Sequence, residues 1–269
     1  MNKKLLAAAV ASAVAVPGFA AADVNTYGTL YIRTQVQDSN ISMIDGATRF
    51  GFNSSKDMGN GNTVSGEIEI GVDATNGGSN PVTRDTWIKF AGDWGSAGVG
   101  NQWSVMSSAF GTCINSGASC SGVIAYQGRV SDSLIITGPA VGPLGLSVQL
   151  EADGSDLAAW AVKTGIDLGS LSIDAGYRDT DSNSLSAVGV SGTTAGIAWG
   201  ASFSSDDTTD GNGLFANISG LKLQYDELEG VTDLNANYNI DLGGAGMRLI
   251  VDDRDDEETK AAVQFNYSL

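Results

Sequence analysis

Few side chains in this 269-residue chain could carry out covalent chemistry. The absence of histidine excludes Ser-His-Asp triads and histidine metal ligands, and no Ser-x-x-Lys motif or lysine-bearing phosphate loop is present. Glu67 and Glu69 share one strand face about 7 Å apart, a spacing open to carboxylate catalysis, although lining a polar surface is the commoner role. The acidic run 252–258 offers oxygen ligands for divalent cations, although such runs are more often solvated loops. We therefore predict no catalytic site, no metal site and no cofactor.

The first 22 residues have the layout of a secretory signal peptide. Two lysines precede an apolar run from 5 to 16, and small residues at Ala20 and Ala22 follow a Pro-Gly break. The apolar run is shorter than the roughly 20 residues that a membrane-spanning helix needs, which argues against a retained anchor. We predict export, with a mature domain covering residues 23–269.

Export also bears on the two cysteines and on the charge of the mature chain. Cys113 and Cys120 are separated by six residues, and in an exported chain this spacing favours a disulfide over a metal site. In the entropic model, closing so short a loop destabilises the unfolded chain by about 2–3 kcal/mol, because it removes conformational entropy. Without Lys3 and Lys4, the 14 basic residues fall to 12 against 31 acidic ones, which argues against nucleic acid as a partner.

The mature chain alternates apolar and polar residues in more than ten segments. From Leu234 to Leu242 every second residue is apolar, which is typical of a strand with one apolar and one wet face. The last segment has the same pattern and carries aromatics on its apolar face. We predict an all-β, transmembrane, antiparallel up-and-down barrel of sixteen strands, near residues 24–37, 47–54, 63–73, 83–91, 96–103, 127–137, 144–152, 157–166, 170–178, 185–191, 194–204, 213–219, 221–227, 232–241, 245–252 and 259–269.

The connections between these strands are of two kinds. One set is short and rich in glycine, whereas the other is longer and acidic, as in a barrel with short periplasmic turns and longer outer loops. An even number of strands then places both termini in the periplasm. Fourteen strands is the alternative, because the segments 185–191 and 213–219 have the weakest alternation.

The alternation also predicts which side chains face the lipid and which face the lumen, the space inside the barrel. Leu144, Leu146, Leu221 and Leu223 belong to the predicted outer face. Gln149 and Gln224, at the alternate positions of the same segments, would face the lumen. A soluble sandwich with the apolar faces packed together is the competing interpretation.

At this point the chain resembles the trimeric general porins of Gram-negative bacteria. The stretches that carry the resemblance are Tyr-Gly-Thr-Leu at 27–30, Arg-Phe-Gly-Phe at 49–52 with Asp-Met-Gly-Asn-Gly at 57–61, residues 84–103 with Gly100 and Gln102, and the segment from Arg129 to Gly138-Pro139. The chain departs from the family at Asn101, where the family has arginine, and at Leu269, where it has an aromatic residue.

The resemblance implies a third loop, about 104–126, folded into the lumen and facing a ladder of arginines. By strand parity, the ladder positions are Arg33, Arg49, Arg84 and Arg129, and the acidic residues of the pore lining are Glu67, Glu69 and Glu151. The competing interpretation is that each arginine only keeps a wide lumen polar. The loop itself has no Asp or Glu, unlike the family's usual loop.

The function implied is an outer-membrane porin, a water-filled channel for passive diffusion of small hydrophilic solutes and ions, and not an enzyme. The resemblance further implies a homotrimer in contact with outer-membrane lipid and lipopolysaccharide. One alternative is a substrate-selective channel, in which lumen aromatics such as Tyr31 bind a sugar or another nutrient. Another alternative is a non-conducting barrel with a structural or adhesive role, or an exported soluble β-protein.

Overall fold

The computed structural model describes residues 24–75, 81–107, 128–154 and 156–269. The predicted signal peptide, both cysteines and most of the predicted third loop lie outside the described residues. The strands are β1 (Val24–Gln37), β2 (Asn40–Asp45), β3 (Arg49–Gly59), β4 (Asn62–Gly71), β5 (Val82–Gly92), β6 (Gly95–Trp103), β7 (Arg129–Thr137), β8 (Leu144–Asp153), β9 (Asp156–Asp167), β10 (Leu171–Thr180), β11 (Ser184–Thr194), β12 (Ile197–Asp206), β13 (Asp210–Ile218), β14 (Leu221–Leu228), β15 (Val231–Asp241), β16 (Ala245–Arg254) and β17 (Lys260–Ser268).

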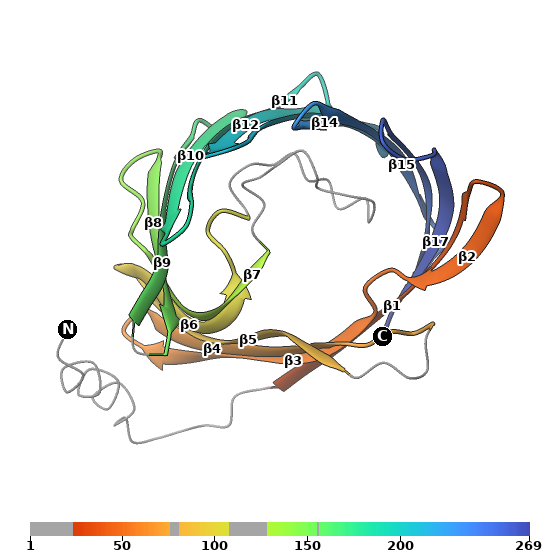
Figure 1. Ribbon diagram of the computed structural model, residues 1–269. Coiled ribbons are helices and arrows are strands. Elements are labelled where there is room, and N and C mark those ends of the chain that lie inside the picture. Colours follow the sequence, from red (N-terminus) through yellow and green to blue (C-terminus); the bar gives the residue numbers. More distant parts are fainter. Residues whose placement is uncertain (1–23, 76–80, 108–127, 155) are drawn as a thin grey trace.

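The strands form one closed antiparallel barrel (Figure 1). From β3 onward each strand pairs with the next along the chain, and β1 closes the ring by pairing with β17, for example Ile32 opposite Phe265. Closure satisfies the backbone groups that an open sheet would leave exposed at its edges. β3 and β2 follow one another along the same edge of β1, so together they make one interrupted strand of the barrel. The predicted sixteen-strand barrel is confirmed, including strands at 185–191 and 213–219.

The interruption between β2 and β3 is one feature that the alternation did not predict. Asp45 accepts backbone N–H groups of Ala47 (2.8 Å) and Thr48 (3.0 Å) and stabilises the bend. Thr48 Oγ1 accepts the Tyr31 N–H at 2.9 Å and donates to the Tyr31 carbonyl oxygen at 3.2 Å, so it replaces the missing strand pairing with β1. The bend fixes where Arg49, the first residue of β3, enters the barrel wall.

The two faces of the wall differ in the way that the alternation predicts. Leu146 and Leu223 on the outer face are 49% and 40% exposed, whereas Gln149 and Gln224 on the inner face are almost fully buried. Such an apolar belt around a polar interior suits a barrel surrounded by hydrocarbon. No helix in the described part of the chain is long and apolar enough to cross a membrane.

The segment that follows β6 turns into the barrel. Met106 is fully buried and, together with Val105, packs with Ala161 of β9 and with Leu185 and Ala187 of β11. These strands are not neighbours of β6 in the sheet, so the contacts cross the interior of the barrel. The packing anchors the beginning of the segment that was predicted to fold into the lumen.

The acidic connections are shorter than the sequence suggested, because the strands extend into the acidic segments. β12 runs to Asp206, whose Oδ1 accepts N–H groups of Thr208 (2.8 Å) and Thr209 (2.9 Å) and closes a tight turn before β13.

The acidic run between β16 and β17 contains an ion pair. There Lys260 holds the pKa of the Glu257 carboxyl below its usual range. No group of three or more acidic or cysteine side chains in the described ranges is arranged to hold a metal ion.

Candidate functional site

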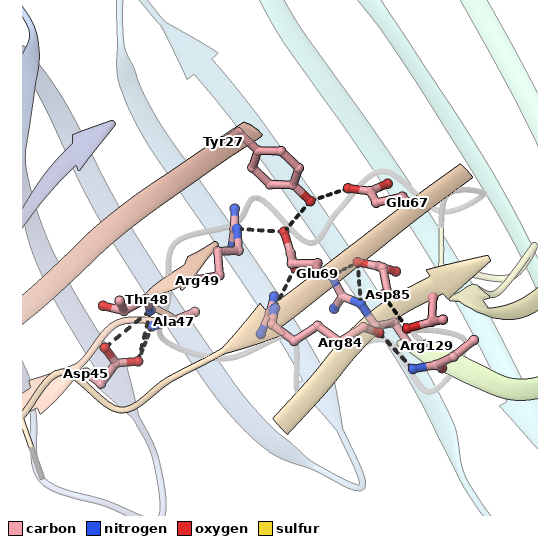
Figure 2. A network of polar contacts seen from close by, with 12 residues as sticks. Tyr27, Asp45, Ala47, Thr48, Arg49, Glu67, Glu69, Arg84, Asp85 and Arg129 are labelled. Carbon is pink, nitrogen blue, oxygen red and sulfur yellow. Dashed lines mark hydrogen bonds and ion pairs between the residues drawn. The ribbon is translucent and has the colours of Figure 1, made fainter. Parts of the chain in front are cut away.

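Four strands bring three arginines to a single carboxylate on the inner wall (Figure 2). Glu69 of β4 lies 3.2 Å from Arg49 Nε of β3, 2.6 Å from Arg84 Nε of β5 and 3.2 Å from Arg129 Nη2 of β7. Only 5% of Glu69 is exposed, so its carboxylate is enclosed by the guanidinium groups. A charge-assisted contact with each of them holds the three cations at one place on the wall.

Asp85 of β5 adds a second carboxylate, and a bulge in the same strand brings Arg84 beside it. Glu69 stands opposite Asp85 but Ile70 stands opposite Thr83, which leaves Arg84 as the extra residue. Both Arg84 and Asp85 therefore reach the inner network, although simple alternation would send neighbouring side chains to opposite faces. Asp85 Oδ2 accepts Arg129 Nη2 at 2.7 Å and Nε at 2.8 Å.

Tyr27 of β1 extends the network to Glu67. Its hydroxyl lies 3.2 Å from Glu69 Oε2 and is also hydrogen-bonded to Glu67 (Figure 2). The ring crosses the backbone of Gly51, where a Cβ atom would lie 2.7 Å from the Tyr27 hydroxyl. Glycine at this position lets the tyrosine lie flat against β3 and reach both carboxylates.

Replacing Gly51 by alanine should displace Tyr27 and destabilise the barrel by about 1–3 kcal/mol, because the new methyl group overlaps the ring and the Ile68 carbonyl oxygen. The measurement is the urea concentration at which the folded, faster-migrating band on unheated gels is lost. Gly145→Ala is the matched control, since a Cβ there meets no atom within 4 Å. Equal midpoints for the two variants would contradict the role of the Gly51 contact.

Two arginines also lie against aromatic rings. The Arg129 guanidinium carbon is 4.1 Å from the centre of the Trp103 ring, and that of Arg49 is 5.4 Å from the centre of the Tyr31 ring. Cation–π contacts of this kind restrict the orientation of the guanidinium planes. The rings therefore help to keep the cations on the wall instead of extending freely into the lumen.

The other residues predicted for the pore lie elsewhere on the inner wall. Arg33 of β1 donates to Gln264 Oε1 of β17 at 2.9 Å. β17 pairs with the edge of β1 opposite to the edge that pairs with β3. Glu151 of β8 accepts Arg178 Nε of β10 at 3.1 Å. The structure therefore groups three of the four predicted ladder arginines and pairs each of them with wall carboxylates. The sequence analysis missed Asp85, although regular alternation with the outward-facing Ile88 places it on the inner face.

Further carboxylates lie on the other side of the barrel. Asp226 of β14 stands opposite Asp233 of β15, and Asn235 Nδ2 donates to Asp252 Oδ1 of β16 at 3.2 Å. All four side chains are nearly fully buried on the inner face. Acidic groups thus also line a part of the wall that lies apart from the arginine cluster.

Comparison with known proteins now identifies the family. A family model described as Gram-negative porin matches residues 7–269. The chain belongs to the Gram-negative porin family. This family and the barrel fold are typical of outer-membrane channels without enzymatic activity.

Individual relatives of the porin are distant. It is 30% identical to a chitoporin of Vibrio furnissii over 159 residues, which are 53% of this chain and only 42% of the relative. Among solved structures, it superposes on Salmonella typhi OmpF in complex with daunomycin with a TM-score of 0.73 and 13% identity, covering 91% of this chain and 97% of the other. The trimer form of Vibrio cholerae OmpT gives a TM-score of 0.72 and 12% identity, with 93% and 100% covered. At these identities, the structural likeness concerns the fold.

Proposed function

We propose that the porin passes small hydrophilic solutes and ions by passive diffusion, with little preference for either sign of charge. The observation that carries this proposal is the pairing of Arg49, Arg84 and Arg129 with Glu69 and Asp85 on the same patch of wall. Selectivity in a water-filled pore follows the charge of its lining, and paired charges largely cancel at the distance of a passing ion. Transport by diffusion requires no cofactor and no covalent step.

Reconstitution in planar bilayers should show ohmic single channels with a reversal potential near zero in a gradient around 1 M salt. At about 0.1 M salt the Debye length grows from roughly 3 Å to roughly 10 Å, so the acidic turns at the mouth should shift the preference toward cations. Reversal potentials at the two salt concentrations test this expectation. Strong selectivity for one sign that persists at 1 M would contradict the proposed charge balance, and absence of conductance would contradict the channel itself.

We infer that the porin assembles as a homotrimer, in contact with outer-membrane lipid and lipopolysaccharide, with both termini in the periplasm. Support comes from the trimer form of OmpT and from the apolar outer face of the first strands, where Phe52, Ile68 and Ile88 are 42%, 49% and 51% exposed. Native mass measurement in mild detergent should give three times the mass of the mature chain. A monomer alone would contradict the assembly.

A substrate-selective channel is the second candidate. It is favoured by the partial likeness to a chitoporin, a protein whose name denotes a chitin-related substrate. A selective channel would still conduct ions, but its current would be blocked saturably by one class of solute.

Two further predictions concern covalent processing of the chain. They are cleavage of the signal peptide before residue 23 and a disulfide between Cys113 and Cys120. Mass measurement of the non-reduced mature protein would test both.

A further inference from the structure

A cavity of about 310 Å³ lies in the wall beside the segment that turns into the barrel. Its volume falls at the lower end of the range of about 300–1,000 Å³ typical of small-molecule sites. Two of the five tryptophans of the chain contribute to it, along with residues that can form hydrogen bonds. The residues that matter for the argument are Trp87, Trp103, Glu67, Lys89, Gln102 and Lys163.

The strand registers place this cavity on the lumen side of the wall. Trp87 stands opposite Glu67, which is hydrogen-bonded to Tyr27 in the inner network. Val105, which packs across the interior of the barrel, covers another part of the cavity. A solute moving through the lumen therefore passes the cavity, whereas the surrounding lipid does not reach it.

Both tryptophan rings are held in place by cations. The Lys89 Nζ lies 5.1 Å from the centre of the Trp87 ring, and the Arg129 guanidinium carbon lies 4.1 Å from the centre of the Trp103 ring. Trp103 remains 44% exposed even so. Large aromatic surfaces that are already ordered lose little entropy when a ligand binds. These two rings therefore differ from surface aromatics that merely face lipid.

The charged groups around the cavity already have partners. Lys163 lies 3.2 Å from Asp174 Oδ1, and Glu67 is hydrogen-bonded to Tyr27. A ligand with a strong net charge would have to displace one of these contacts. A neutral ligand with an apolar face and polar edges fits better, because the indole rings supply flat apolar surface and Gln102 and the paired ions supply hydrogen bonds.

We propose that this cavity binds a pyranose ring of a neutral oligosaccharide and retains the sugar as it passes through the lumen. The apolar C–H face of the ring would lie on tryptophan, and its hydroxyl groups would contact the polar lining. The inference rests on the proposed channel function and names the substrate class of that channel.

Single-channel recording with added sugar tests the inference. Chitohexaose and maltohexaose are the neutral probes, and polyethylene glycol of similar mass controls for simple obstruction. At least one sugar should interrupt the current reversibly and saturably, whereas the polymer should not. Open channels that neither sugar interrupts would overturn the sugar site while leaving the channel intact. Absence of conductance would instead refute the channel function.

Substitution of the two tryptophans tests whether the sugar blocks the current at this cavity. Trp87→Ala and Trp103→Ala should each weaken the apparent sugar affinity about tenfold, since truncating a tryptophan at the centre of a contact commonly costs at least that much. Trp160→Ala is the matched control, because Trp160 lies on the outer face and is 5.4 Å from the ring of Tyr177. If the Trp87→Ala variant does not assemble, the sugar affinity of the Trp103→Ala variant decides alone. If sugar blocks the assembled tryptophan variants with unchanged apparent affinity, the assignment of the binding site to this cavity is overturned.

Discussion

Replacement of Glu69 by glutamine should convert a channel with little charge preference into one that prefers anions. The substitution removes the carboxylate that Arg49, Arg84 and Arg129 share, and it leaves Asp85 as the one carboxylate in contact with Arg129. A unit charge about 4 Å from an ion changes the energy of that ion by about 1 kcal/mol even in bulk water, which corresponds to roughly a fivefold change in occupancy. The chloride-to-potassium permeability ratio, obtained from reversal potentials in a potassium chloride gradient at about 0.1 M, should therefore rise several-fold. The rise should be smaller at 1 M, where the Debye length of roughly 3 Å is shorter than this separation.

Glu67→Gln is the matched control for this experiment. Glu67 lies two residues away on the same face of β4, and its hydrogen bond is to Tyr27. Removing its charge should shift the reversal potential less, because no arginine loses a direct partner. Equal shifts for the two variants would show that total charge, and not the shared contact of Glu69, sets the preference. No shift for Glu69→Gln would mean that the cluster does not lie at the narrow part of the pore.

Replacement of Gln149 by leucine should make the open channel noisier. Gln149 is fully buried, its Oε1 accepts the Val105 N–H at 2.9 Å, and its Nε2 donates to Glu151 at 2.7 Å. Losing a buried hydrogen-bond partner costs about 1–3 kcal/mol, which is enough to loosen a local contact. The segment that Met106 and Val105 anchor in the lumen should then fluctuate, and the variance of the open-channel current should rise.

Gln224→Leu controls for the loss of a buried glutamine as such. Gln224 is also buried on the inner wall, but it lies on β14 and donates to Asp226 of the same strand. Its replacement should leave the current variance of the open channel near that of the unsubstituted protein. Equal variance in the Gln149→Leu channel and in the unsubstituted one would show that packing of Met106 alone anchors the segment.

The fold was largely predictable because a membrane barrel imposes a simple local rule. Each strand must show apolar residues to the lipid and polar residues to the lumen, so period-two alternation marks both the strands and their faces. Leu146 and Gln149 occupy the predicted faces for this reason. The bend at 46–48 and the strand extensions into acidic segments escaped prediction. They depend on side-chain contacts such as those of Asp45 and Asp206, which the apolar pattern does not register.

The sequence by itself determined that this chain forms an antiparallel barrel with charged residues inside, and it indicated which arginines face inward. Only the tertiary structure decided which charges meet. A single extra residue in β5 turns Arg84 toward the lumen beside Asp85, and Gly51 lets Tyr27 cross a strand to reach Glu69. Alternation assigns a side chain to a face, but register and bulges place it along and around the barrel. Charges interact over a few ångströms, so the balance of the pore lining follows from that placement.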